Sequence, residues 1–226
     1  MIITNAMNYH KNSVKLLIYG PPGTGKTPLA LTAEAPIIIA SDPGLETIKG
    51  YDIAIAEVTN YKEVIDSFKW ITESNETRFY NTICLDSVSQ HADFIAYHHI
   101  SKARDKRQGY GLYQEEYMTY MNKIVFDIDK NFYLIARRED VLIDKKNDIY
   151  EFWPSVNTAK MRTWTTHQFD QILAIKKENE STQYERIVIQ TKGDHLYKAR
   201  DRSGALDPIE EPNIYNIINK IKNGVK

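Results

Sequence analysis

Several kinds of residue and segment are scarce in this chain of 226 residues, and each scarcity narrows what the chain can be. The single cysteine, Cys84, cannot form a disulfide within the chain, which indicates a reducing compartment. No apolar run approaches the ~20 residues that a membrane-spanning helix needs. The first residues are polar and lack the apolar core of a secretory signal. We therefore expect a cytoplasmic protein.

The chain also lacks an excess of charge of either sign. It has 29 Lys and Arg residues against 30 Asp and Glu residues, a formal net charge of −1. Such a chain has no global field that attracts nucleic acid, so any such binding must come from local patches. His98 and His99 are adjacent, but no spaced set of metal ligands accompanies them, and we interpret them as a helix-surface pair.

Alternating apolar and amphipathic segments predict an α/β fold with a mostly parallel sheet. Continuous apolar runs typical of buried parallel strands occupy 14–19, 36–40, 82–86 and 132–136. Helices are expected at 61–72, 88–102 and 112–128, and the segment 139–165 is expected to be irregular. Runs at 169–175 and 184–190 predict an antiparallel hairpin, with a further strand at 196–200. We expect one domain, 1–226, with a loose lead-in over 1–12 and a closing helix within 212–226.

A glycine-rich loop between a β-prone run and a helix-prone run is the most informative segment. It matches the pattern GxxxxGK[ST] with Gly20, Pro21, Pro22, Gly23, Thr24, Gly25, Lys26 and Thr27, and Pro28 follows. Glycines let backbone N–H groups surround a polyphosphate, and the following helix points its positive end at the same anion. The motif predicts nucleotide binding, with Lys26 on the outer phosphates and the Thr27 hydroxyl on Mg²⁺. Pro28 is compatible with the first turn of a helix.

Two carboxylates stand at the ends of other buried strands. Asp86 ends the run 82–86, about sixty residues after the loop, and we predict that it holds Mg²⁺ through a water. The next residue, Ser87, cannot supply a general base. Asp42, after the run 36–40, is our candidate for the base that activates the attacking water; a turn residue is the alternative, and Glu46 is the fallback base.

The order of these motifs resembles the small single-domain RecA-like ATPases of bacteriophages. These are phage AAA-family nucleotide-binding proteins, some of which act in single-strand annealing and recombination. The resemblance covers about residues 14–210. The sequence of the loop alone is more similar to that of AAA+ proteins. Two other motifs are more similar to RecA-like ATPases: Asp86-Ser87 and the late run 198–204, Lys-Ala-Arg-Asp-Arg-Ser-Gly.

The resemblance implies a fold and an activity. The fold would be a three-layer RecA-like P-loop NTPase core, with a mostly parallel central sheet flanked by helices and a C-terminal β-hairpin extension. The activity would be hydrolysis of ATP with Mg²⁺, in the host cytoplasm if the chain is phage-encoded.

The resemblance also implies an oligomer. In RecA-like and related hexameric ATPases, a Lys-x-Arg pair on a late strand reaches the nucleotide of the neighbouring subunit. Lys198 and Arg200 match that spacing, and residues i and i+2 of a strand share a face. We expect a homo-oligomer, ring or filament, with nucleotide at the subunit interface; an ordinary basic edge is the alternative. Arg137 and Arg138 stand where relatives carry a polar γ-phosphate sensor, and pairing with nearby carboxylates is the alternative for them.

Two segments correspond in order to the DNA-contacting loops of RecA-like proteins. Both combine cations with aromatic rings, as single strands require. The candidates in the first segment, 102–111, are Lys102, Arg104, Lys106, Arg107 and Tyr110. Those in the second segment, 140–165, are Lys145, Lys146 and Trp153. We expect single-stranded DNA as the partner, in homologous recombination or strand annealing; solvated charged loops are the alternative.

Other functions are left open by the sequence. An AAA+ switch or remodeller that acts on a protein partner would need a helical lid after the sheet. A GTPase is suggested only by the run 191–194, which imitates a guanine-reading motif, and the choice between ATP and GTP is a binding measurement. A small-molecule kinase and a non-catalytic nucleotide-binding module are further alternatives.

Overall fold

The fold is built on a ten-stranded sheet in a computed structural model that describes residues 12–224. The strands are β1 (Lys15–Gly20), β2 (Pro36–Ala40), β3 (Ala54–Glu57), β4 (Thr82–Asp86), β5 (Asn131–Asp144), β6 (Ile149–Pro154), β7 (Gln171–Glu178), β8 (Arg186–Gln190), β9 (Arg200–Asp201) and β10 (Ile209–Glu210). Their order across the sheet is β10-β8-β7-β1-β5-β4-β2-β3, with β6 paired to β5 and β9 to β7. The strands from β7 to β3 in this order are parallel, whereas β8 and β10 are antiparallel to their neighbours.

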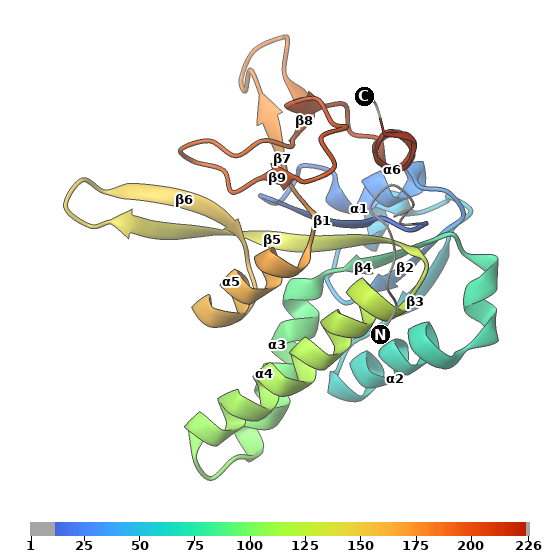
Figure 1. Ribbon diagram of the computed structural model, residues 1–226, viewed down its shortest axis with the longest axis vertical. Helices are drawn as coiled ribbons and strands as arrows, with labels where there is room; N and C mark the ends of the chain where they lie inside the picture. Colours follow the sequence, from blue (N-terminus) through green and yellow to red (C-terminus); the bar gives the residue numbers. More distant parts are fainter. Residues whose placement is uncertain (1–11, 225–226) are drawn as a thin grey trace, which may run out of the picture.

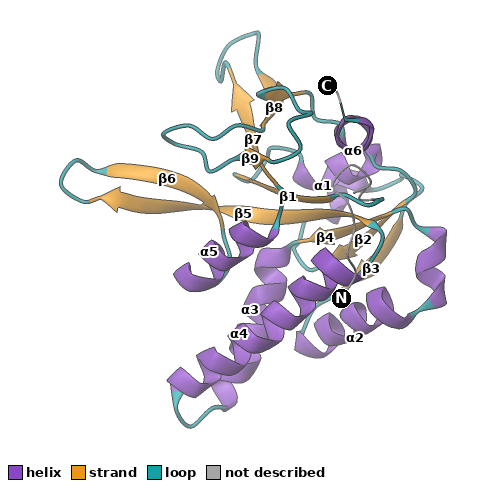
Figure 2. Ribbon diagram, viewed as in Figure 1, coloured by secondary structure: helices purple, strands orange, loops and turns teal. Residues whose placement is uncertain are grey.

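Helices cover both faces of the sheet (Figures 1 and 2). They are α1 (Lys26–Leu29), η2 (Ala30–Thr32), η3 (Leu45–Ile48), α2 (Tyr61–Glu73), η4 (Asn75–Phe79), α3 (Val88–Lys102), α4 (Lys106–Asn122), η5 (Lys123–Asp127), α5 (Ala159–Gln168) and α6 (Ile214–Asn223). Alternate residues of β1 point to opposite sides, so Leu17 packs with α2, α3 and α4, and Ile18 packs with α1 and α6. Because both faces are covered, the central strands are apolar throughout, which is the pattern that predicted them.

The three layers and the antiparallel pair of β7 and β8 confirm the predicted fold class. The closing helix is α6, while the lead-in predicted over 1–12 lies almost wholly outside the described residues. Between residues 12 and 224, every helix is too short or too polar to cross a bilayer.

Most of the segment 102–111 is helical, so the expectation that it forms a loop is wrong. Only 103–105 separates α3 from α4. Asp105 begins α4 because its side chain accepts a hydrogen bond of 2.9 Å from the Arg107 N–H. A Cβ on Gly109 would lie 2.8 Å from the Ile100 Cα, so this glycine lets two helices pack closely rather than loosening a loop.

The segment 139–165 is regular, which corrects a second expectation. Strand β5 continues to Asp144 and pairs with β6 as an antiparallel hairpin, and α5 follows. Figure 1 shows this β5–β6 hairpin projecting from the body. In the outer half of the hairpin, β5 and β6 pair only with each other and are largely exposed. These segments therefore lack the continuous apolar pattern by which buried strands are predicted. The strand expected at 196–200 is likewise reduced to the two residues of β9.

We predict that Gly20→Ala destabilises the fold. A Cβ at position 20 would lie 2.3 Å from the Ile175 carbonyl oxygen of the neighbouring strand β7, a clash with backbone that cannot move aside. The free energy of unfolding in urea should fall by about 1–3 kcal/mol. The matched control is Gly111→Ala on α4, where a Cβ meets nothing within 4 Å; it should gain up to about 1 kcal/mol from helix propensity. Equal effects of the two substitutions would contradict this account.

Candidate functional site

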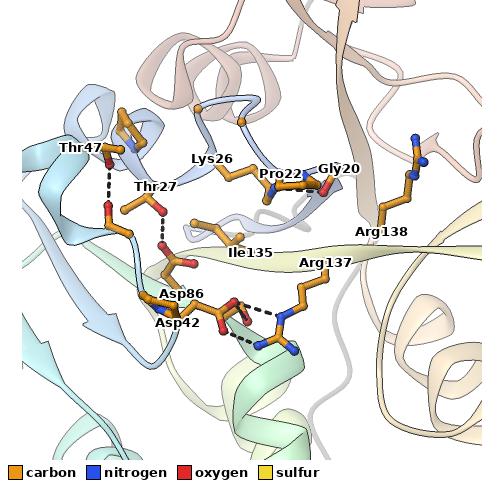
Figure 3. Close-up of a pocket in the computed structure, with 16 residues that line it drawn as sticks. Gly20, Pro22, Lys26, Thr27, Asp42, Thr47, Asp86, Ile135, Arg137 and Arg138 are labelled. Atoms are coloured by element: carbon orange, nitrogen blue, oxygen red, sulfur yellow. Dashed lines mark hydrogen bonds and ion pairs between the residues drawn. The ribbon is translucent and has the colours of Figure 1, made fainter.

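The carboxyl ends of β1, β2 and β4 and the middle of β5 surround a cavity of about 690 Å³ (Figure 3). The lining comes from most of the glycine-rich loop, from Asp42 and Asp86, and from Arg137 and Arg138. The segment after β2 adds Pro43, Gly44 and Thr47, which sequence reasoning had not assigned to the site. Strands distant in the sequence therefore bring the predicted loop and both predicted carboxylates together.

The glycine-rich loop has the backbone form that an anion cradle needs. Gly23 and Gly25 have φ values of 78° and 74°, and the space that a Cβ would take at either is free of backbone. Gly25 precedes the first residue of α1, so the N–H groups of that helix open toward the cavity. Pro28 lies within this first turn, as expected.

The side chains of two further loop residues, Thr24 and Lys26, stabilise its shape. Thr24 is buried, and its hydroxyl donates a 2.9 Å hydrogen bond to the Pro21 carbonyl. Lys26 Nζ donates to the carbonyls of Gly20, at 2.9 Å, and Pro21, at 2.7 Å. Burial lowers the pKa of Lys26, against the nearby charges of Asp86 and Asp42, which raise it. A bound polyphosphate would accept a stronger, charge-assisted hydrogen bond from this ammonium than the neutral carbonyls do.

The predicted magnesium ligands meet directly. The Thr27 hydroxyl donates a hydrogen bond to Asp86 Oδ2 (Figure 3). Burial raises the pKa of Asp86, and the Thr27 hydrogen bond and the charge of Lys26 oppose that rise. A hydroxyl and a carboxylate are oxygen ligands that suit Mg²⁺, which binds one or two such groups and completes its shell with phosphate and water. The described residues hold no cluster of three or more His, Cys, Asp or Glu that would suit a metal bound by protein alone.

Asp42 also lies in the cavity, but both of its oxygens are occupied. Arg137 donates from Nε to Oδ2 at 3.2 Å and from Nη2 to Oδ1, and the Ser87 hydroxyl donates to Oδ2 at 2.7 Å. The bond to Asp42 raises the pKa of Arg137. The fallback base, Glu46, is exposed outside the cavity and pairs with Lys49 at 3.4 Å. The geometry thus favours Asp42 over Glu46 as the carboxylate that faces a nucleotide.

The pair of Arg137 and Asp42 was not anticipated from the sequence. Strands β5 and β2 lie on either side of β4. Arg137 lies within β5, just beyond the residue that pairs with Asp86, and it faces Asp42, which follows β2, across the end of β4. Arg137 also donates to Gln90 and, from Nη1 at 3.3 Å, to Asp93, both on α3. The strand ends were visible in the sequence, but their order across the sheet was not.

The two neighbouring arginines have different surroundings. Arg138 pairs with Asp140 at 2.8 Å and lies 4.1 Å from the centre of the Phe152 ring. Figure 3 shows its side chain directed away from Asp42 and Asp86. Pairing with a nearby carboxylate, the alternative considered from the sequence, is therefore what Arg138 does, while Arg137 faces the cavity.

Residues 12–203 match the family model of the AAA domain (AAA_24). The chain belongs to this AAA domain family. The match covers most of the chain, including the loop, Asp42, Asp86 and Arg137, so the cavity is that of a P-loop ATPase.

Other comparisons are more distant. A search of the curated proteins gives no match. Among solved structures, the KaiC-like protein PH0186 from Pyrococcus horikoshii OT3 is similar, with 13% identity and a TM-score of 0.46. That likeness covers 78% of this chain and 77% of the other.

Lys198 and Arg200 of this AAA domain do not form the expected pair on one strand face. Strand β9 begins only at Arg200, so the i, i+2 geometry does not apply. Lys198 Nζ lies 4.6 Å from the centre of the Trp153 ring. Arg200 donates from Nη2 to the carbonyls of Thr166, at 2.6 Å, and Phe169, at 2.7 Å, at the end of α5. The shared strand face from which the pair was predicted is therefore absent, while a contact of either cation with a neighbour's nucleotide stays a prediction.

The DNA candidates of the AAA domain fall on two separate projections. The first set lies at the exposed tip of α3 and α4: Lys102, Arg104, Lys106, Arg107 and Tyr110. Lys145 and Lys146 lie in the turn of the β5–β6 hairpin. Trp153 is half-buried at the base of that hairpin, where Lys198 covers its ring and its Nε1 donates to Glu151 at 3.0 Å. Its surface is therefore already used.

We predict that Asp86→Asn stabilises the nucleotide-free AAA domain at neutral pH. Because burial raises the pKa of Asp86, the folded chain keeps a proton that the unfolded chain loses first. Stability therefore falls as the pH rises from the ordinary carboxyl pKa through the raised one. Asparagine removes this cost, so Tm at about pH 7 should rise by a few degrees, and by less at about pH 4.

The same variant should lose the Mg²⁺-dependent part of the Tm increase that ATP produces, because one carboxylate oxygen for the ion is gone. Thermal unfolding with ATP, with and without Mg²⁺, gives this difference directly. A variant that is less stable than the wild type at neutral pH would contradict the burial argument.

Proposed function

We propose that this AAA domain is a Mg²⁺-dependent ATPase of the RecA-like type that works on single-stranded DNA, in recombination or strand annealing, and is of phage type. The observation that carries the ATPase proposal is the meeting of Lys26, the Thr27–Asp86 pair and Asp42 in one cavity. A phosphate cradle, two magnesium ligands and a carboxylate facing them are the parts that phosphoryl transfer to water needs.

Each residue has a role in that reaction. The N–H groups around Gly23 and Gly25 and the ammonium of Lys26 bind the phosphates and neutralise charge as it develops. Thr27 and Asp86 would hold Mg²⁺, which when bound supplies further neutralisation of the phosphate oxygens. Asp42 accepts the proton of the attacking water.

The ion pair between Arg137 and Asp42 would control when Asp42 can accept the proton of the attacking water. While Arg137 and Ser87 both donate to Asp42, they occupy three of the about four acceptor sites of the carboxylate and compete with a water for it. A γ-phosphate in the cavity that Arg137 lines competes for the guanidinium. Movement of Arg137 toward that phosphate would free Asp42 to act as the base.

The alternative, an AAA+ switch or remodeller acting on a protein, has less support. It requires a helical lid beyond the sheet. Within the described residues, the helix that follows β10 is α6, and its Ile214, Ile217 and Ile218 are buried in the core against the sheet. A helix committed to the core is not available to close over a nucleotide.

We predict that Asp42→Asn lowers kcat for ATP hydrolysis by about 10²–10⁴-fold, since the amide cannot accept the proton of the water. The Kd for ATP should stay close to that of the wild type, because Lys26 and the loop are unchanged. Phosphate release is measured with Mg²⁺ and with EDTA, and the matched control is Glu46→Gln, an exposed carboxylate of the same segment. Turnover that survives Asp42→Asn and is lost in Glu46→Gln would reassign the base to Glu46.

An oligomer with shared sites is also part of the proposal, with Lys198 as the cation that a neighbour supplies. Subunits carrying Lys26→Ala keep that cation but lack a working loop, and subunits carrying Lys198→Ala keep the loop. If Lys198 acts in trans, a mixture of the two inactive variants should recover turnover, because hybrid interfaces combine the intact parts. Native mass spectrometry, with and without single-stranded DNA, reports the assembly. A monomer, or a mixture no more active than its parts, would contradict the shared site.

A further inference from the structure

A groove lies at the far end of the helical layer, away from the loop that binds phosphate. It has a volume of about 550 Å³, and α3, the start of α4 and the segment after β6 line it. The residues that matter here are Tyr97, Ile100, Arg104, Lys106, Tyr110 and Asn157. The lining thus combines two phenol rings, an apolar floor, two cations and one amide.

The two rings are unusually open to solvent. The Tyr97 residue is 76% exposed and the Tyr110 residue is 40% exposed. Tyrosines that serve packing in the same helices, such as Tyr113 and Tyr117, are fully buried. Exposed rings beside a groove offer flat surfaces on which unpaired bases can stack, with an effect that does not depend on sequence.

Cations outnumber carboxylates at the tip of the groove, while Asp93 adds one carboxylate to its lining. Residues 102–107 contain four cations and one carboxylate, a net charge of +3 in a chain whose formal net charge is −1. That carboxylate, on Asp105, is used in the cap of α4. Within residues 12–224, Arg104, Lys106 and Arg107 have no carboxylate partner, so their charge is free for an outside anion.

The β5–β6 hairpin offers a poorer anion surface. Residues 139–151 contain five carboxylates against two lysines, a net charge of −3. Glu139 and Asp140 are paired with arginines at the hairpin base, and Asp144 holds the turn by accepting from Lys146 and Asn147 N–H groups. Of the two segments singled out in the sequence, the structure favours the helical tip.

We propose that the α3–α4 groove binds a single-stranded nucleic acid, with bases stacked on Tyr97 and Tyr110 and phosphates paired with Arg104 and Lys106. This inference rests on the proposed function, which names single-stranded DNA without a site. Tyr97 and Asn157 are new to the site: Tyr97 lies outside both segments singled out in the sequence, and Asn157 lies within 140–165 but was not among its candidates.

One residue of the groove contacts a residue of the nucleotide site. Asp93 lines the groove, and its two oxygens accept from Asn157 Nδ2, at 3.1 Å, and from Arg137 Nη1, at 3.3 Å. Arg137 in turn holds Asp42. A nucleic-acid strand that binds Asn157 would therefore alter the contact of Asp93 with Arg137, and Arg137 is the residue that pairs with the candidate base, Asp42.

The test is binding of a fluorescently labelled oligothymidylate to the full chain, followed by anisotropy at several salt concentrations. Tyr97→Ala should weaken binding about tenfold, the typical loss of one stacked base, and Tyr97→Phe should retain it. Removing Arg104 and Lys106 together should reduce the slope of log K against log salt by about 1.4, or about 0.7 for each lost phosphate contact. The matched control is Tyr184→Ala, an equally exposed tyrosine (71%) between β7 and β8, which should bind like the wild type.

Different failures have different meanings. If the wild type hydrolyses ATP and ignores the oligonucleotide, the DNA partner of the proposed function is refuted together with the groove. If the wild type binds and all groove variants bind equally well, the groove alone is refuted. A lower native mass in Tyr97→Ala with unchanged oligonucleotide affinity would also overturn the inference, because the groove would then be an interface between copies of the chain.

Discussion

The parallel arrangement of β1, β5, β4 and β2 is the constraint on which the site depends. Parallel strands end at the same edge of a sheet, so whatever follows each of them is brought into one region. The loop after β1, Asp42 after β2, Asp86 at the end of β4 and Arg137 within β5 all reach the cavity in this way. The parallel form itself requires helices on both faces, because crossover connections must return over the sheet. The same apolar burial that stabilises the fold therefore assembles the polar site.

Within the site, each charged side chain is hydrogen-bonded to a protein group. Lys26 is placed on carbonyls, Asp86 on a hydroxyl, and Asp42 on Arg137 and Ser87. Burial penalises the charged forms of Lys26 and Asp86, and it moves their pKa values in opposite directions toward neutrality. A polyphosphate with its magnesium ion would satisfy these groups better than they satisfy one another. We therefore expect these contacts to be exchanged for contacts with the nucleotide and its ion when they bind.

The sequence was sufficient for the motifs and insufficient for their surroundings. Apolar runs predicted β1, β2 and β4 because complete burial leaves a pattern, and the loop was found because its chemistry requires fixed residue types at fixed spacing. The outer half of β5 and strand β6 were missed because an exposed two-stranded hairpin buries little. The segment 102–111 was assigned to a loop because a glycine that permits close packing, such as Gly109, and one that loosens a loop look alike in sequence. The Arg137–Asp42 pair joins positions 95 residues apart, and only the order of strands across the sheet reveals it.

Arg137 links two regions that the sequence presents as unrelated. Its guanidinium bonds to Asp42 in the cavity and to Gln90 and Asp93 on α3, and α3 leads without a break to the basic tip. A guanidinium has a limited number of N–H donors in a fixed plane, so a stronger partner on one side weakens the contacts on the other. Coupling of this kind is reciprocal: if nucleotide alters what binds at the tip, a ligand at the tip must alter nucleotide affinity by the same factor. The physical route between the two sites is then a single side chain on a central strand, rather than a movement of the whole helical layer.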